Sequence, residues 1–330
     1  MKTLLFFPLL LLLLLSSCNQ KEYFRNEGYI FGTTYHIVYE YDKDVHDTIR
    51  ARFNAYDASM STYNKASLIS RVNRNETDVP DSLLTAVILK AQELNALSDG
   101  AFDITIAPLA NAWGFGFSKA DSITPQLVDS LLQFTGMHRL RVENGRIIKD
   151  DPRMMLETSA VAEGFGVDYV GVLLEHLGIE NYMVEVGGEV RMKGKNPKGN
   201  KWNIGIDKPI DDPTAQNREI QEILSVTDCA VSTSGNYRKF FVKDGKKYSH
   251  TIDPKSGYPV SHNLLSTTVV AHDCISSDGL GTTFMVLGLE KGMALAESLP
   301  NVEAYFIYAD TTGQVRTAMT SGFEALIKKE

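Results

Sequence analysis

The spacing of hydrophobic residues along the chain predicts a set of amphipathic helices. Residues 44–55 place Val45, Ile49 and Phe53 four positions apart, and residues 81–97 have a similar helical spacing. Side chains with that spacing lie on one face of a helix, where they can be buried together. Helices are therefore expected over residues 44–55, 81–97, 124 to about 136, 161–177, 277–287 and 289–298.

Alternating and continuous apolar runs predict strands. Over residues 29–41, Tyr35, Ile37 and Tyr39 fall on one face of an extended chain, because successive side chains of a strand point to opposite sides. Further strands are expected over residues 182–190, 202–206, 265–271 and 304–308.

Two dipeptides indicate hairpins, because Asn-Gly and Asp-Gly favour the tight turns that join antiparallel strands. They stand at residues 144–145 and 244–245, each between two apolar runs. Strands and helices follow one another without a steady βαβ order. The expected fold class is therefore α+β, with mixed, largely antiparallel sheets and packed helices.

The amino terminus has the layout of a secretory signal. Lys2 precedes an apolar core over residues 4–15, which is shorter than the roughly 20 residues of a transmembrane helix. The segment that ends the apolar core, Leu15-Ser16-Ser17-Cys18, resembles the lipobox of bacterial lipoproteins, in which the cysteine is acylated. Two or more acyl chains anchor stably, at about 0.8 kcal/mol per buried methylene. The alternative is an ordinary cleaved signal followed by an unrelated cysteine.

These features predict the organisation of the chain. We expect a signal peptide over residues 1–17, a lipidated tether over 18–28 that begins at Cys18, and a single domain over 29–330. The net charge of -8 argues against a nucleic-acid surface. Cys229 and Cys274 can form a disulfide in an exported protein, but two free thiols are favoured, because a chain of this size needs no cross-link.

Polar, glycine-containing segments stand out from the apolar pattern. Asp278 and Thr282 are four positions apart, so on a helix they share one face. A carboxylate and a hydroxyl suit Mg²⁺, which prefers oxygen ligands. The alternative is a helix-capping aspartate next to a solvated threonine.

His250 follows a predicted strand and precedes Asp253 in a turn. A histidine near neutral pKa can act as a general base, although a lone histidine is more often structural. Residues 232–235 offer hydroxyls and backbone N–H groups to a phosphate, or form a turn. Glu157 and Glu163 are explained equally well as charges near a helix N-terminus.

Taken together, these segments resemble the ApbE-type flavin transferases in order and spacing. They are FGTTY (31–35), MSTY (60–63), GAFDIT (100–105), WGFG (113–116), SAVAEG (159–164), VEVGGE (184–189), STSGNYR (232–238), HTIDP (250–254) and SDGLGT (277–282). The resemblance implies an ApbE-like fold and an enzyme that binds FAD and Mg²⁺, releases AMP and leaves FMN on a threonine of a target protein. Two alternatives are an FAD pyrophosphatase at the same site and a lipoprotein that only binds FAD.

The resemblance also implies roles for individual residues. Mg²⁺ would be held by Asp278, Thr282 and the main-chain carbonyl of Ala160, with His250 and Asp278 as catalytic residues. FAD-contacting positions would be Phe31, Tyr63, Ala101, Phe102, Asp103, Glu157, Glu163 and Ile252. Phe31 stands where many members have methionine, Glu157 where aspartate is common, and Glu163 where many have lysine.

The implied partners follow from the same resemblance and from the lipobox. They are FAD, an exported or membrane-bound flavoprotein subunit as acceptor, and a bacterial membrane reached through the lipid on Cys18. The expected location is the periplasmic face of that membrane, inner or outer.

Overall fold

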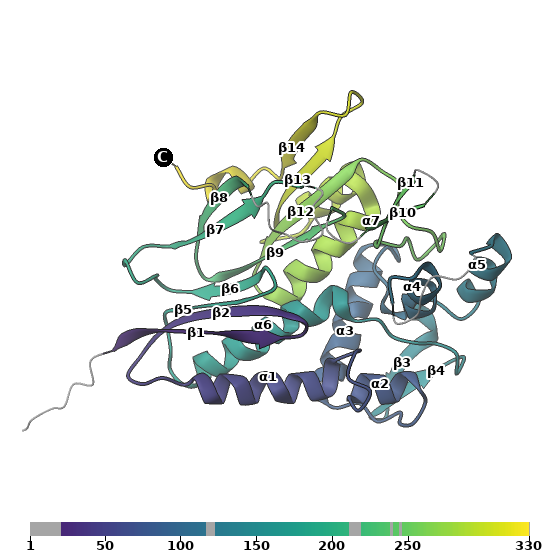
Figure 1. The fold of residues 1–330 in the computed structure, drawn as a ribbon, viewed down its shortest axis with the longest axis horizontal. Helices are drawn as coiled ribbons and strands as arrows, with labels where there is room; N and C mark the ends of the chain where they lie inside the picture. The colour runs from purple at the N-terminus through teal and green to yellow at the C-terminus, as the bar shows by residue number, and fades with distance from the viewer. Residues whose placement is uncertain (1–20, 117–122, 211–218, 238–239, 244–245, 330) are drawn as a thin grey trace, which may run out of the picture.

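An eight-stranded antiparallel sheet forms the centre of the molecule (Figure 1). The computed structural model describes residues 21–116, 123–210, 219–237, 240–243 and 246–329. In spatial order the strands are β1 (Glu22–Ile30), β2 (Thr33–Tyr41), β5 (Tyr182–Val186), β6 (Glu189–Lys193), β9 (Cys229–Gly235), β12 (Leu264–Ala271), β13 (Glu303–Ala309) and β14 (Val315–Met319).

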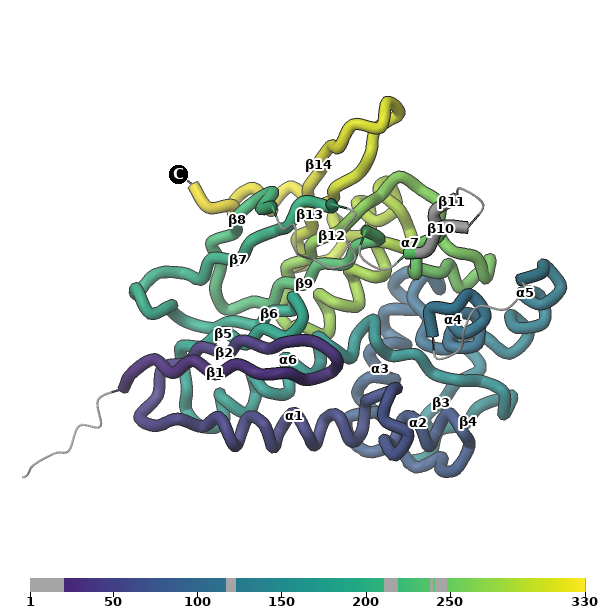
Figure 2. The backbone as a smooth tube through the Cα atoms, in the orientation of Figure 1, coloured from purple at the N-terminus to yellow at the C-terminus, as the bar shows by residue number. Residues whose placement is uncertain are grey.

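Three two-stranded antiparallel sheets accompany it. They pair β3 (Leu140–Glu143) with β4 (Arg146–Lys149), β7 (Trp202–Asp207) with β8 (Ile220–Val226), and β10 (Phe240–Lys243) with β11 (Lys246–Ser249). In Figure 2 the hairpin of β13 and β14 projects beyond the rest of the sheet.

The helices gather on one face of the large sheet. They are α1 (His46–Met60), α2 (Leu68–Asn73), α3 (Ser82–Leu97), α4 (Ala107–Trp113), α5 (Pro125–Leu132), α6 (Ser159–His176) and α7 (Cys274–Ser298), with the 3₁₀ turns η1 (Ile104–Ile106) and η2 (Met137–Arg139). A third 3₁₀ turn, η3 (Phe323–Leu326), lies elsewhere. Helix α6 contacts α7, α1 and strand β5, so it occupies the middle of this layer. The ribbon of β7 and β8 and the turn η3 cover the other face, where Trp202, Leu224 and Phe323 are buried together.

Burial explains this layering. Tyr35, Ile37 and Tyr39 point into the core beneath the helices, as their alternation predicts. Val38, between them, lies in the core on the opposite face of the sheet. The expected α+β class with largely antiparallel sheets is confirmed, and each face of the large sheet is covered by a separate layer.

The amino-terminal strand corrects two expectations. Residues 22–28, expected within a tether, belong to β1, and the strand expected over 29–41 is two strands joined at Phe31-Gly32. Strand β1 lies at the sheet edge with most of its side chains at least partly exposed. Backbone pairing to β2 holds it, and the hydrophobic pattern gives no sign of such pairing.

Two more strands depart from the sequence pattern. The run 182–190 is a hairpin that turns at Gly187-Gly188, both with positive φ. Residues 232–235, read as a phosphate contact or a turn, lie in the central strand β9 between β6 and β12. Their hydroxyls mislead because they are paired inside the protein, for example Thr233 Oγ1 with Thr268 Oγ1 at 2.8 Å.

Most helix predictions are confirmed. Helix α3 begins after Asp81, whose carboxylate accepts the N–H of Leu84, and α5 begins at Pro125 after the capping Thr124. Helix α5 ends at Leu132, before the expected end near residue 136. Gly288 interrupts α7 with φ 77°, which separates the two helical runs that the sequence predicts.

The predicted hairpin of β3 and β4 is present, and β10 and β11 flank residues 244–245, which lie outside the described residues. The signal peptide and Cys18 also lie outside them.

Both described cysteines, Cys229 and Cys274, are free thiols, so the favoured alternative is confirmed. Within the described ranges, no helix has the length and apolar character needed to cross a membrane.

Candidate active site

Helices α6 and α7 pack closely where two of the polar segments meet. A Cβ atom added at Gly164 would lie 2.4 Å from the carbonyl oxygen of Cys274 and 2.8 Å from Cβ of Asp278. No side chain fits in that space, so glycine is required for the contact. We call this contact the α6–α7 seam, formed by Ala160, Gly164 and Asp168 of α6 and by Cys274, Asp278 and Thr282 of α7.

Asp278 is buried in the seam and bonded across it. The backbone N–H of Gly164 donates to Asp278 Oδ2 at 3.0 Å. In a regular helix that N–H is directed at the carbonyl four residues earlier, which belongs to Ala160. The predicted carbonyl and carboxylate ligands therefore meet at the same N–H group, although they lie far apart in the sequence.

The alternative of a capping aspartate is wrong for Asp278. The residue that caps α7 is Asp273, whose Oδ1 accepts the N–H of Ser276 at 3.0 Å. Asp278 lies one turn further along, and Thr282 follows in the next turn, half-buried. The two side chains therefore lie on one face of α7, as their spacing predicts.

The donor set tests whether a metal ion fits here. Across the described ranges, no three His, Cys, Asp or Glu side chains come together as a protein-only metal site requires. One carboxylate, one hydroxyl and one carbonyl are instead what Mg²⁺ uses when water and substrate phosphates complete its six ligands. The seam thus fits Mg²⁺ better than zinc, which prefers nitrogen and sulfur ligands.

A further carboxylate, Glu189, lies beside the seam and was not predicted as a site residue. It is 8 % exposed, and its Oε2 accepts no hydrogen bond from any described group. The pKa of Glu189 is raised well above its ordinary value, chiefly by burial and then by the charges of Asp278 and Glu163. The β5–β6 turn brings the acids together: an ideal Cβ at Gly187 lies 3.2 Å from Glu163 Oε2 and 3.4 Å from Glu189 Oε2. Accumulated negative charge favours a bound cation.

Phe31 occupies the β1–β2 turn with a φ of 54°, an uncommon value for a bulky residue. Its ring packs edge-on against Phe53 at 5.8 Å and tilted on Tyr56 at 5.3 Å. A Cβ at Gly166 would lie 2.8 Å from the ring, so α6 provides the floor beneath it. Tyr63, which follows α1, is 82 % exposed and presents its ring to the surroundings.

The run Ala101-Phe102-Asp103 is largely enclosed. All three side chains are buried, and Phe102 belongs to a core cluster that includes Leu84 of α3 and Phe284 of α7. Asp103 Oδ1 accepts the N–H and the hydroxyl of Thr105, at 2.7 and 2.6 Å, and Oδ2 accepts the N–H of Met137 at 2.9 Å. Burial raises the pKa of Asp103, and these hydrogen bonds oppose the shift. The run fixes a local turn, and its contact with FAD stays a prediction.

Glu157 immediately precedes α6. Its Oε1 accepts the N–H of Ser159 at 3.0 Å, which agrees with the alternative of a charge at the helix N-terminus. Its own N–H donates to the carbonyl of Ile104 at 2.7 Å. Glu157 therefore joins the start of α6 to the Asp103 turn.

His250 lies in a second, aromatic part of the candidate site. It directly follows β11, and its ring meets Phe115 edge-on at 6.4 Å. Trp113 stacks on Tyr248 at 5.8 Å and donates its Nε1–H to the carbonyl of Gly257 at 2.9 Å. We call this group, with Tyr258, the aromatic cluster.

The predicted contact residue Ile252 is 2 % exposed and packs beside Trp113. Asp253 Oδ1 accepts the N–H of Lys255 at 3.0 Å, so this carboxylate orders its own turn. The aromatic cluster therefore sets the path of the chain on both sides of His250.

Serine and threonine hydroxyls of β9 and β12 support α7 from the sheet. Ser232 Oγ lies 2.8 Å from Ser277 Oγ, and Thr267 Oγ1 donates to the carbonyl of Gly281 at 3.1 Å. A Cβ at Gly281 would lie 2.7 Å from Ser234 Oγ. These hydroxyls fix the height of the helix that carries Asp278 and Thr282.

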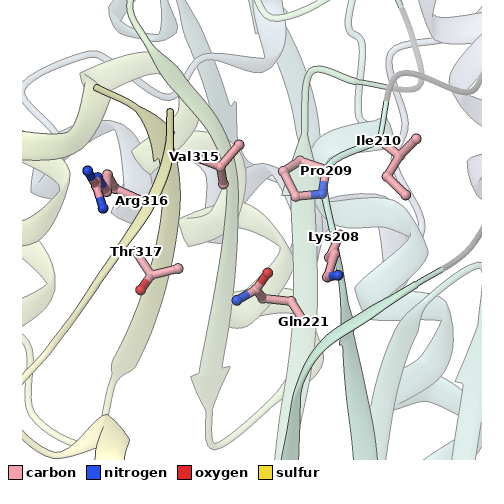
Figure 3. A pocket seen from close by; sticks show the side chains of 7 residues that line it. All are labelled: Lys208, Pro209, Ile210, Gln221, Val315, Arg316 and Thr317. Atoms are coloured by element: carbon pink, nitrogen blue, oxygen red, sulfur yellow. The ribbon is translucent and has the colours of Figure 1, made fainter. Parts of the chain in front are cut away.

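One groove lies apart from these residues. It encloses about 570 Å³ between the end of β7, strand β8 and the edge strand β14 (Figure 3). Lys208 and Arg316 line it, but each is paired with an acid, Glu219 at 2.7 Å and Asp310 at 3.0 Å. None of the predicted site residues lines this groove.

Comparison with known proteins gives one consistent result. The sequence profile of the ApbE family matches residues 31–306. The FAD:protein FMN transferase of Vibrio cholerae is 38% identical over 330 aligned positions, which cover 96% of this chain and 97% of the relative. The structure of the flavin transferase ApbE from the same organism superposes with a TM-score of 0.82 at 35% identity, covering 93% of this chain and 99% of that one. The apo flavinyl transferase ApbE of Pseudomonas stutzeri gives a TM-score of 0.82 at 32% identity, over 94% and 98%.

Proposed function

This chain belongs to the ApbE family, and on that premise we propose how its residues bind and use their substrates. It is an FAD:protein FMN transferase, an enzyme that moves FMN from FAD to a protein. Taking FMN from FAD leaves AMP, because the bond that breaks is the pyrophosphate between the two halves of FAD. The flavin phosphorus gains a bond to a hydroxyl of the acceptor, and the hydroxyl proton must be removed.

The observation that carries the proposal is the hydrogen bond from the N–H of Gly164 to Asp278 Oδ2. It brings the carbonyl of Ala160 and the carboxylate of Asp278 to one point on the α6–α7 seam, with Thr282 one turn away. We propose that these three groups hold Mg²⁺. When bound, Mg²⁺ neutralises pyrophosphate charge, which is the main requirement of a phosphoryl transfer. The half-buried Glu163 and the buried Glu189 lie close to Asp278, and a bound cation would relieve the crowding of carboxylates that helps to raise the pKa of Glu189.

His250 is the candidate general base. An acceptor hydroxyl has a high pKa, so a base must take its proton as it attacks phosphorus. His250 is half-buried and follows a short ribbon, where the aromatic cluster sets the course of the chain. The loss of such a base costs about 10²- to 10⁴-fold in rate.

Binding of FAD is assigned to the residues around the seam. The rings of Phe31 and Tyr63 offer aromatic faces to the flavin or adenine, one packed on α6 and the other largely exposed. The remaining assigned contacts come from the Asp103 turn, the start of α6 and the aromatic cluster: Ala101, Phe102, Asp103, Glu157, Glu163 and Ile252.

We further propose where the enzyme works and on what. The acceptor is a threonine of an exported or membrane-bound flavoprotein subunit, and the enzyme is held at the periplasmic face of a bacterial membrane by a lipid on Cys18. The lipobox-like exit and the short apolar core of the leader support this location. Mass spectrometry of the membrane-extracted chain tests it: a diacylglyceryl group on an amino-terminal Cys18 is expected, and an unmodified cysteine would exclude anchoring.

Flavin fluorescence in a denaturing gel tests the transfer itself. The purified chain in detergent is mixed with FAD, Mg²⁺ and a candidate acceptor subunit. A covalent fluorescent band that needs Mg²⁺ and is lost in His250→Ala supports both the transfer and the base. AMP without a band would indicate an FAD pyrophosphatase, and bound FAD without AMP, with two different acceptors, would indicate a carrier of FAD.

A further inference from the structure

The α6–α7 seam contains a second buried carboxylate, Asp168, whose hydrogen bonds go to Arg191, Cys274 and Ile275 and to none of the three proposed ligands. Asp168 belongs to α6 and is 5 % exposed. Its Oδ1 accepts the backbone N–H of Cys274 at 2.9 Å, and its Oδ2 accepts the N–H of Ile275 at 2.8 Å. These are the first two residues of α7, whose N–H groups have no partner within the helix. A side chain of one helix therefore caps the other.

Asp168 is itself held from the sheet. Arg191 of β6 donates Nη1–H to Asp168 Oδ1 at 2.8 Å and Nη2–H to Glu175 Oε1 at 3.1 Å. Its Nε–H donates to the hydroxyl of Tyr182 at 3.0 Å. A Cβ at Gly171 would lie 2.7 Å from Cδ of Arg191, so this glycine makes room for the arginine along α6. Sheet, α6 and the start of α7 are thus joined through a single carboxylate.

The position of this bridge relates it to the proposed cation site. Gly164, one turn before Asp168 on α6, donates to Asp278, which lies one turn after Cys274 on α7. The two bonds run between the same pair of helices and are separated by about one turn on each. If the Asp168 bridge is lost, the Gly164–Asp278 bond and the packing of the two helices are left to set the distance between the carbonyl of Ala160 and the carboxylate of Asp278.

We propose that Asp168 is a positioning residue for the cation site: it fixes α7 against α6 so that one divalent cation reaches the ligands of both helices. This inference rests on the proposed function, because it takes Ala160, Asp278 and Thr282 as the ligands. Asp168 contacts neither the cation nor FAD. Its contribution is to the affinity for the cation rather than to the chemical step.

The chain offers a matched control. Asp273 also caps α7, but its carboxylate accepts the N–H of Ser276 within the same helix and, among the described residues, forms no hydrogen bond to α6. Asp273→Ala and Asp168→Asn therefore both weaken the side-chain capping of α7, because asparagine keeps only one of the two acceptor oxygens, and only Asp168→Asn weakens the connection between the helices. A role limited to helix stability predicts the same effect for both variants.

The test uses Mn²⁺ as the probe, with the full chain in detergent and saturating FAD, and measures free Mn²⁺ by electron paramagnetic resonance. Groups that orient metal ligands typically contribute 10- to 100-fold to affinity, so Asp168→Asn is expected to weaken Mn²⁺ binding by at least about 10-fold. Asp273→Ala is expected to stay within about twofold of the unmodified chain. In turnover, the apparent KM for Mg²⁺ rises in Asp168→Asn while kcat recovers at high Mg²⁺.

Two results would overturn the proposal: unchanged Mn²⁺ affinity in Asp168→Asn, or equal losses in both variants. Asp278→Ala separates this inference from the proposed function, since an unchanged affinity in that variant means that the cation site itself is wrong. If Asp168→Asn does not fold, Gly164→Ala replaces it. The new Cβ meets Cys274 and Asp278 and must push α7 away from α6, so Mn²⁺ binding as tight as in the unmodified chain would again exclude the proposal.

Discussion

The α6–α7 seam and the aromatic cluster hold the two halves of the proposed chemistry by different means. In the seam, buried carboxylates accept backbone N–H groups across two helices that touch at a glycine. In the aromatic cluster, ring packing and one indole N–H hold a short segment that follows a two-stranded ribbon. A cation site depends on fixed distances between ligands on two helices, whereas a base depends on the position of the one segment that carries it.

The largest effect is expected in the seam. Asp278→Ala removes the only carboxylate among the three proposed ligands, so it should reduce Mg²⁺-dependent FMN transfer by about 10³-fold, since metal stabilisation of transferring charge is worth several kcal/mol. Circular dichroism should show a folded protein. Transfer by Asp278→Ala at the rate of the unmodified chain would remove the seam from the mechanism.

A smaller effect is expected in the aromatic cluster. Trp113→Phe keeps a ring against Tyr248 but leaves the carbonyl of Gly257 without its donor, at a cost of about 1–3 kcal/mol. Because the segment that carries His250 loses its support, FMN transfer is expected to fall by about 10-fold while Mn²⁺ affinity stays the same.

The other tryptophan is the control for that variant. Trp202 is equally buried and donates its Nε1–H to the carbonyl of Lys193 at 3.0 Å, on the opposite face of the sheet. Trp202→Phe should lower the Tm to a similar extent without loss of transfer. Equal losses of transfer in both variants would show that the aromatic cluster has no special connection to His250.

The smallest effect concerns stability in the seam. Because burial raises the pKa of Glu189, the folded chain binds a proton that the unfolded chain releases, and stability falls as pH rises from near 4.5, the ordinary pKa, towards the folded pKa. Glu189→Gln should remove this loss and raise the free energy of unfolding of the metal-free chain at neutral pH by about 1 kcal/mol. Urea unfolding across pH 4–8 measures it, with the exposed Glu180→Gln as control. A pH dependence identical in all three proteins would show that Glu189 is charged at no cost.

The sequence predicts well what depends on local pattern. Amphipathic spacing and capping residues located α3, α5 and α6, and Asn-Gly located the hairpin of β3 and β4. The hydrophobic pattern did not predict β1, whose exposed edge has no hydrophobic signature. It also did not predict β9, whose hydroxyl side chains bond to Ser277 of α7 and Thr268 of β12 inside the protein. Those pairings depend on neighbours distant in the chain.

The site shows the same division. The spacing of Asp278 and Thr282 predicted a shared helix face, and the structure has them on one helix. The contact of Gly164 with α7, the cap supplied by Asp168 and the burial of Glu189 each depend on two elements coming together. No local pattern encodes such contacts, although Glu189 and Gly164 stand within segments that carry the family resemblance.

The early start of β1 has a mechanical consequence. With Cys18 as the anchor that we propose, the pairing of Glu22 with Tyr41 leaves four peptide steps between lipid and sheet, at most about 14 Å when fully extended. A tether that lasted to residue 28 would reach more than twice as far. With that anchor, the folded domain stays next to the bilayer. An acceptor threonine must then be presented close to the membrane surface to be modified.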